Sequence, residues 1–270
     1  MEHTFLSDLG YFLAFFSFVT ALFSTVSYFL AFRNNKDMVV SQLWKRSGRI
    51  SFRLHSLGIL GVIGLLYFLI YGHFYEFQYV WKYSNDSMPL RYLVSCFWGG
   101  QEGSFILWMF WNVVIGNVLI RTAKNWENSV MTIFVLSQVF LTTMILGVYV
   151  FDFKIGSNVF LLTKNLPQNI GMPWTELPNY MDLPMFKDGQ GLNPLLQNYW
   201  MTIHPPTLFL GFALTAVPFS FAIAGLMTNK FKEWIKPSIS WTFAGIGVLG
   251  IGILMGGMWA YESLSFGGFW

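Results

Sequence analysis

The sequence predicts an all-α polytopic membrane protein. Only 11% of its 270 residues are charged, whereas a soluble domain carries about 25%. Hydrophobic residues make up 54% of the chain, and they gather in runs of about 20, long enough to cross a hydrocarbon core of roughly 30 Å as a helix. Helices and closed barrels are the folds that satisfy every backbone group in a bilayer, and these runs are about twice the length of barrel strands.

The first half of the chain predicts three membrane spans. Residues 10–32 and 55–72 form apolar runs separated by a basic segment. The third run, 104–121, follows the motif WGGQEGS. Its Glu102 would lie at the helix N-terminus, where a negative charge is favourable by roughly 0.3–1 kcal/mol.

The second half predicts three more spans. The fourth is the apolar run 130–151. The fifth, 206–227, begins at paired prolines, which the first turn of a helix tolerates well. The sixth, 239–260, is rich in glycine and contains GxxxG at 252–256, which predicts close packing on a neighbouring helix. The sequence therefore predicts six transmembrane helices.

The basic residues predict the orientation of these spans. The loops after spans one, three and five hold 11 of the 16 Lys and Arg residues, so the positive-inside rule places both termini on the outer, periplasmic side. The two larger loops, 74–103 and 152–205, then also lie outside. Trp174 and Tyr180 in the second loop predict an ordered segment against the membrane, or else an interfacial aromatic belt. Because topology explains the basic residues, the net charge of +3 does not indicate a nucleic-acid partner.

The stretch MTIHPPTLFLG, residues 201–211, contains the leading candidate ligand, His204. A residue before proline is disfavoured in the α region, so the motif predicts a helix start with His204 just outside and Pro205 and Pro206 inside. A constrained imidazole would suit a metal or cofactor that binds in one geometry. One histidine cannot make a zinc site but can occupy one axial position of a haem iron. The alternative is a capping or interfacial histidine.

Two further motifs predict surfaces near the same membrane face. In WGGQEGS, residues 98–104, the glycines permit close approach of another surface, although the motif could simply be a helix cap after a tight turn. The last 15 residues, GGMWAYESLSFGGFW, combine aromatic residues with glycines. From the residues alone, these motifs predict an outer-face site for a flat, apolar ligand that can carry a metal.

Three motifs in this order and spacing resemble the cytochrome c biogenesis proteins of the CcmF/CcsA type: WGGQEGSFILW, LNPLLQNYWMTIHPPTLFLG and WAYESLSFGGFW. These are haem-handling proteins with a tryptophan-rich WWD domain, and the N-terminal part of CcmF-type members is most similar. The resemblance implies that haem b is bound at the outer face and presented for covalent attachment to apocytochrome c. It also implies a haem chaperone and a thioreduction subunit as partners, and a bacterial inner membrane rather than an organellar one.

The resemblance also implies a set of site residues. His204 would be an axial ligand of the haem iron, and other motif residues would lie beside the porphyrin or border the site. No nucleophile or acid–base pair is evident in the sequence, so a role within a haem lyase complex implies positioning of the reactants. The implied cofactor-binding residues are His204, Trp98, Glu102, Trp259, Gly267, Gly268, Phe269 and Trp270.

This sequence departs from the family pattern at its end. In the family, the WWD motif continues past the final tryptophan into an Asp-Pro-x-Glu-Asn stretch, and a second outer histidine lies further on. We therefore expect 1–270 to be a single transmembrane haem-handling domain that forms an N-terminal fragment, or one half of a split protein. The alternatives are a transporter or quinone-interacting respiratory subunit, which would need buried polar residues within the spans, and a membrane anchor or assembly scaffold. The spans hold few polar residues, of which Asn112, Asn117 and Gln138 are the main ones.

Overall fold

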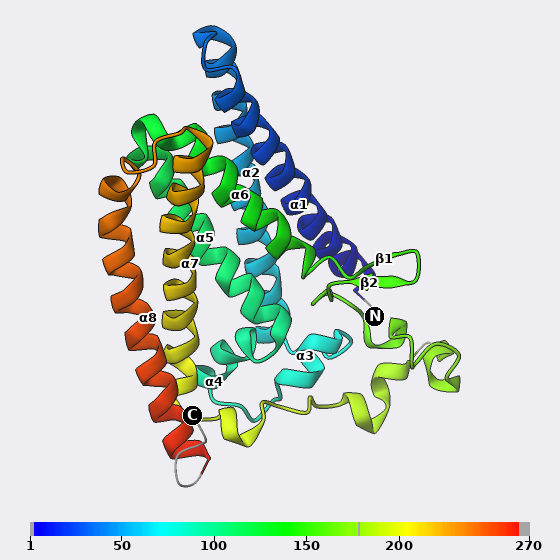
Figure 1. Ribbon diagram of the computed structural model, residues 1–270. Helices are drawn as coiled ribbons and strands as arrows, with labels where there is room; N and C mark the ends of the chain where they lie inside the picture. The colour runs from blue at the N-terminus through cyan, green and yellow to red at the C-terminus, as the bar shows by residue number, and fades with distance from the viewer. Residues whose placement is uncertain (1–2, 178, 265–270) are drawn as a thin grey trace.

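A computed structural model describes residues 3–177 and 179–264 as a bundle of long helices with a layer of short elements at one end (Figure 1). Five of the described helices are long and apolar enough to cross a membrane, which confirms the all-α polytopic class. The predicted fourth span is the 17-residue helix α6, about 25 Å long. The long helices are α1 Thr4–Arg33, α2 Met38–Tyr71, α5 Gln101–Thr122, α6 Glu127–Thr143, α7 Tyr199–Met227 and α8 Ile235–Ser263.

Two predicted helix ends are wrong. Helix α2 begins at Met38 instead of residue 55, because Asp37 caps it by accepting hydrogen bonds from two backbone amides of its first turn. The basic segment before the predicted second span is therefore helical. Helix α6 ends at Thr143 and does not reach residue 151, since Gly147 takes a positive φ of 63° and a short strand follows.

The predicted start of the fifth span is also wrong. Helix α7 begins at Tyr199, where the side chain of Asn198 accepts a hydrogen bond from the Trp200 amide at 2.9 Å. His204 is therefore the sixth residue of the helix and does not lie outside it. The paired prolines stand in the second turn, where each removes a backbone donor.

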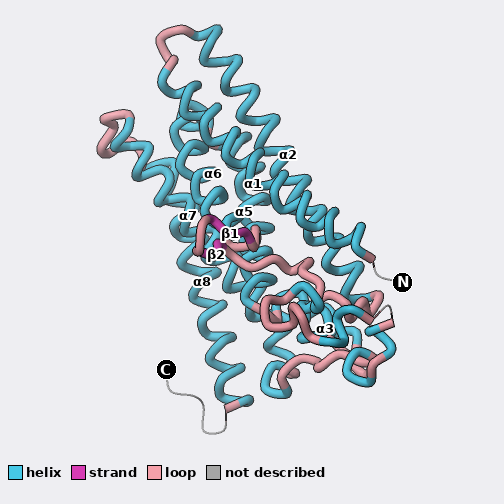
Figure 2. The backbone as a smooth tube through the Cα atoms, turned by 90° about the vertical axis from the view of Figure 1, so that its right-hand side faces the viewer, coloured by secondary structure: helices cyan, strands magenta, loops and turns pink. Residues whose placement is uncertain are grey.

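The layer at one end of the bundle is built from the two segments predicted to be large loops, and most of the non-helical chain gathers there (Figure 2). Strands β1 and β2 pair antiparallel, and Phe77 forms an isolated bridge with Leu162. The Trp81 indole donates to the Met185 carbonyl at 2.9 Å, and Phe186 is 2% exposed. The second segment is therefore ordered against the first. The short elements are α3 Gln78–Tyr83, α4 Leu90–Ser95, η1 Cys96–Trp98, β1 Val148–Val150, β2 Phe153–Ile155, η3 Thr163–Asn165, η4 Pro173–Glu176, η5 Tyr180–Asp182, η6 Pro184–Phe186 and η7 Pro194–Leu196.

The helix packing leaves α8 at the edge of the bundle. Helices α1 and α2 form an antiparallel pair, α6 packs on α1, and α5 packs on both α2 and α7. Helix α8 packs on α7 and makes no comparable contact with another described helix. The first residues of α1 and the last described residues of α8 lie at the end of the bundle that carries the short elements (Figure 1). This arrangement agrees with termini on one side; that this side is periplasmic remains a prediction. The short 3-10 helix η2, Lys124–Trp126, joins α5 to α6 at the opposite end.

Candidate functional site

His204 projects from α7 onto α8, and its hydrogen-bond partner sets the tautomer of the neutral imidazole. Its Nδ1 lies 2.8 Å from the carbonyl oxygen of Gly252. Because a carbonyl can only accept, Nδ1 carries the proton and Nε2 keeps its lone pair in the neutral ring. Among the described residues, Nε2 has no hydrogen-bond partner. Metal-ligating histidines are oriented in this way, with the second nitrogen donating to a backbone carbonyl.

A glycine makes room for this imidazole on α8. A Cβ atom added at Gly256 would lie 2.7 Å from Cε1 and 3.1 Å from Nε2 of His204. Gly252, one turn earlier, allows the helices to approach, since a Cβ there would lie 2.9 Å from the Leu208 Cα. The predicted GxxxG packing at 252–256 is therefore present, and its second glycine, Gly256, also makes room for the His204 ring.

The motif WGGQEGS stabilises the His-Pro-Pro segment of α7 through one hydrogen bond. Pro205 has no N–H to offer the carbonyl of Met201, four residues earlier. The Trp98 indole donates to that carbonyl at 2.8 Å. This bond replaces the lost backbone donor, which explains how α7 continues through the prolines. Trp98 is 8% exposed, so its side chain is buried against α7 and stabilises that helix.

The motif at the end of the chain, which begins in α8, is hydrogen-bonded to the segment before α7. The Trp259 indole donates to the Leu195 carbonyl at 3.1 Å. The Asn198 side-chain amide donates to Glu262 at 3.1 Å. These two bonds join the end of α8 to η7 and to the cap of α7. The three motifs singled out in the sequence therefore meet around the first turns of α7.

The other predicted site residues are placed differently. Glu102 lies at the start of α5 and lines a separate pocket of about 90 Å³ with Tyr79, Lys82 and Lys154. Its described surroundings are α3 and the β2 segment, and His204 does not line that pocket. The predicted residues Gly267, Gly268, Phe269 and Trp270 lie outside the described residues.

Tyr79 holds the WGGQEGS turn, a role that no motif in the sequence indicates. Its hydroxyl donates to the Phe97 carbonyl at 2.8 Å and accepts from the Gly100 amide at 3.0 Å. Burial raises the pKa of Tyr79 well above its ordinary value, so the hydroxyl keeps the proton that it donates. A Cβ at Gly103 would overlap both this hydroxyl and the Phe97 carbonyl, which explains the glycine there.

The remaining histidines have other partners. His3 pairs with Glu76 at 2.6 Å, and His73 lies 2.9 Å from the Tyr75 hydroxyl, both at the end of the bundle that carries the short elements. His55 is 0% exposed within the bundle, so no large ligand reaches it without rearrangement of the helices. Among the described histidines, His204 is the one that combines an orienting hydrogen bond, a ring nitrogen without a described partner and room for the ring beside Gly256.

Comparison with known proteins points to one family. The model of the Cytochrome C assembly protein family matches residues 98–270. The cytochrome c-type biogenesis protein CcmF of Haemophilus influenzae is 32% identical over 206 residues, which are 76% of this chain and 28% of that protein. CcmF of Pseudomonas aeruginosa is 34% identical over 73% of this chain and 27% of its own length. NrfE of Haemophilus influenzae is 27% identical over 98% of this chain and 38% of its own length.

A solved structure shares the fold. The structure titled Cytochrome c Heme Lyase CcmF superposes on all of this chain with a TM-score of 0.67 and 22% identity, and the match covers 38% of that protein. The chain thus spans about 28% of the length of the first curated relatives it matches. The apolar helices and these bacterial relatives support the predicted location, as a multi-pass protein of the bacterial inner membrane.

Proposed function

The chain belongs to the Cytochrome C assembly protein family, and from this premise we propose that it handles haem during cytochrome c maturation. It would bind haem b at the outer membrane face and present it for covalent attachment to apocytochrome c. The observation that carries this proposal is His204, whose Nδ1 is fixed by the Gly252 carbonyl at 2.8 Å while Nε2 is left free beside the Gly256 notch.

In this proposal, His204 supplies one axial ligand through Nε2, and the hydrogen bond from Nδ1 to Gly252 fixes the plane of the ring. Bound haem supplies the vinyl groups that become joined to the cysteine thiols of apocytochrome c. The side chains contribute position and orientation, which is the main contribution a protein makes when the cargo carries the reactivity.

The aromatic residues would form the surface on which the porphyrin rests. Trp259 is partly exposed, and its indole orientation is fixed by the Leu195 carbonyl. Phe269 and Trp270 would complete this surface, together with Gly267 and Gly268, which precede them directly in the sequence. Trp98 would act through α7, and Glu102 would border the site only from the separate pocket at the start of α5.

The proposed partners follow the same chemistry. Apocytochrome c would approach from the outer side, where the ordered layer of short elements lies. A haem chaperone would deliver the haem, and a thioreduction subunit would keep the apocytochrome thiols reduced. Membership of the family favours this function over the transporter and quinone-interacting alternatives.

A visible absorption spectrum of the detergent-purified protein supplied with haem tests the proposal. Oxidised and dithionite-reduced spectra would be recorded for the unmodified protein, for His204→Ala and for His73→Ala. His73 is the matched control, since it is a partly exposed histidine at the same end of the bundle, hydrogen-bonded to Tyr75. We expect His204→Ala to lose haem or change its ligation, while His73→Ala keeps the unmodified spectrum. Unchanged haem content and ligation in His204→Ala would refute the assignment.

A further inference from the structure

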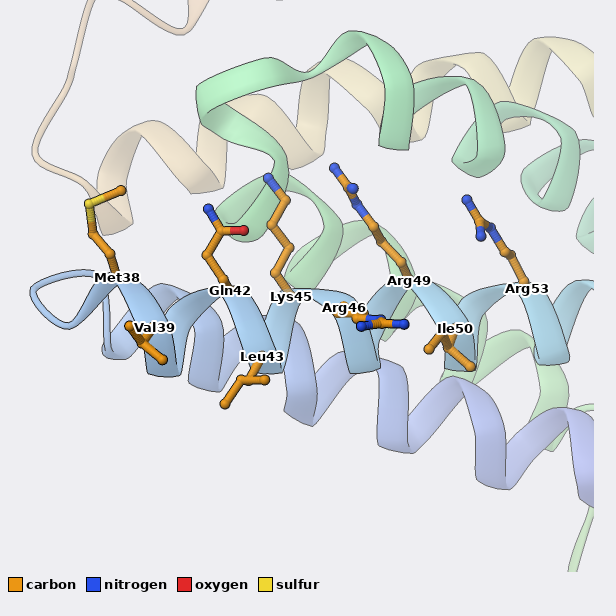
Figure 3. Close-up of a pocket in the computed structure, with 9 residues that line it drawn as sticks. All are labelled: Met38, Val39, Gln42, Leu43, Lys45, Arg46, Arg49, Ile50 and Arg53. Atoms are coloured by element: carbon orange, nitrogen blue, oxygen red, sulfur yellow. The ribbon is translucent and has the colours of Figure 1, made fainter.

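The end of the bundle opposite His204 carries a groove rich in positive charge. It runs along the first half of α2, has a volume of about 990 Å³, and is shown in Figure 3. We propose that this basic groove binds the phosphate headgroup of an anionic phospholipid. The residues that line it are Met38, Val39, Gln42, Leu43, Lys45, Arg46, Arg49, Ile50 and Arg53.

One carboxylate neutralises only part of the charge. Glu127, 2% exposed at the start of α6, lies 2.8 Å from the Lys45 Nζ and 2.6 Å from the Arg49 Nε. Arg46 and Arg53 are exposed, and neither forms an ion pair with a described residue. Four cations and one carboxylate therefore leave three positive charges in the groove.

The position of these cations along α2 matches the headgroup layer. From Arg53 to Tyr71 the helix rises about 27 Å, close to the roughly 30 Å of a hydrocarbon core. Arg49 and Arg46 then lie about 6 and 10 Å further along the helix, in or just beyond the headgroup region. The α1–α2 hairpin is inclined relative to α7 and α8 (Figure 1).

Exposed apolar side chains at the same level favour a lipid over a soluble anion. Leu43 and Ile50 are 62% and 48% exposed among the cations of α2. On α1, Val26 and Phe29 are 44% and 40% exposed. These α1 residues lie at the level of the groove, because the preceding turn of α1 is tied to α2 by the hydrogen bond from Ser24 to the Gly48 carbonyl at 2.9 Å. A soluble phosphate would leave this apolar surface in water, whereas the acyl chains of a lipid would cover it.

The amphipathic spacing points to the same ligand. Val39, Leu43, Arg46 and Ile50 recur every three or four residues, so they share one strip of the helix. Figure 3 shows Lys45, Arg49 and Arg53 pointing to the same side of α2, where Lys45 and Arg49 pair with Glu127 at the start of α6. Basic residues mixed with apolar ones beside a membrane span are typical of anionic-lipid recognition.

The test compares two double variants of equal charge. Arg46→Gln/Arg53→Gln removes the two cations that have no described ion pair, and so leaves Glu127 with both of its partners. Lys232→Gln/Lys236→Gln removes two exposed cations at the same end of the bundle, outside the groove. Thermal unfolding midpoints would be measured in neutral detergent during titration with phosphatidylglycerol, with phosphatidylcholine or with inorganic phosphate.

We expect phosphatidylglycerol to raise the midpoint of the unmodified protein and of the Lys variant at the same lipid concentration. The Arg variant should need roughly 30-fold more of it, from two lost cation–phosphate attractions. Phosphatidylglycerol should also copurify with the first two proteins and be depleted from the third, which provides a readout independent of unfolding. Equal protection by phosphatidylcholine, equal protection by inorganic phosphate, or an equal loss in the Lys variant would each overturn the proposal.

Discussion

The fit between His204 and α8 gives a prediction that a single methyl group tests. In Gly256→Ala, the new Cβ would lie 2.7 Å from the His204 Cε1. Carbon atoms prefer a separation of at least about 3.5 Å, so the ring must retreat by about 0.8 Å. The Nδ1 hydrogen bond to Gly252, now 2.8 Å, would then lengthen to about 3.6 Å and cease to be a hydrogen bond.

The energies decide the sign of the change. Replacing glycine by alanine within a helix is favourable by up to about 1 kcal/mol. Against this, the added methyl group costs about 1–3 kcal/mol of overpacking, and the lost hydrogen bond costs about 1 kcal/mol. Gly256→Ala should therefore lower the free energy of unfolding by about 1–3 kcal/mol. Gly250→Ala is the matched control, because a Cβ there meets nothing within 4 Å and the variant should be neutral or slightly stabilised.

Two assays check this prediction. Thermal unfolding in detergent measures the packing, and haem titration followed by the Soret band measures the site. A ligand histidine that loses its orienting partner typically loses 10–100-fold in metal affinity, so Gly256→Ala should bind haem about 10–100-fold more weakly than Gly250→Ala. If the two alanine variants match each other in both assays, the contact between His204 and Gly256 is refuted. If only the unfolding differs, the packing is right and the role of His204 as a ligand is refuted.

Three further changes have expected outcomes. Trp98→Phe should destabilise the protein by about 1–3 kcal/mol, because the indole donor to a buried carbonyl is lost; adding Pro205→Ala restores a backbone donor, and a double-mutant unfolding cycle should show the recovery. Glu127→Gln should cost about 2–3 kcal/mol in chemical unfolding, since its two cationic partners lose their carboxylate. Burial raises the pKa of the Cys96 thiol from 9.0 to about 12. The folded state therefore binds this proton more tightly than the unfolded state does. The stability that the bound proton contributes is present below pH 9 and is lost progressively up to pH 12. Unfolding midpoints measured across that range should fall, and those of Cys96→Ala should fall less.

The order and class of the long helices could be predicted from the sequence because membrane spans follow from composition alone. Hydrophobic runs mark where a helix must exist, but they do not mark where it ends. The polar first half of α2 shows this limit: Asp37 caps a helix that continues from Met38 through basic residues into the apolar run. The predicted end of α6 is wrong for the opposite reason: the apolar run continues past the point where the helix stops. Gly147 takes a positive φ inside that apolar sequence.

The His-Pro-Pro motif shows why the site could be predicted only in part. The rule that a pre-proline residue leaves the α region is local, and it predicted a helix start at Pro205. The actual helix passes through the prolines, because Trp98, more than 100 residues earlier, donates to the freed Met201 carbonyl. A single sequence gives no sign of that pairing. It does give the candidate ligand and the GxxxG spacing, but not the contact between them.

The packing of α7 on α8 links the orientation of His204 to the whole helix pair. His204, Leu208 and Gly211 lie on one face of α7, at intervals of four and three residues. A Cβ at Gly211 would lie 2.7 Å from the Cα of Leu249, so the backbones are in close contact there as well as at Leu208. Helix α8 cannot slide along α7 without collisions at these positions, and its carbonyl at Gly252 stays in place for His204. The stiffness of the proposed iron ligand therefore comes from the glycine face of a helix that packs mainly on α7 among the described long helices, and a change at Gly211 should alter haem binding without touching the haem.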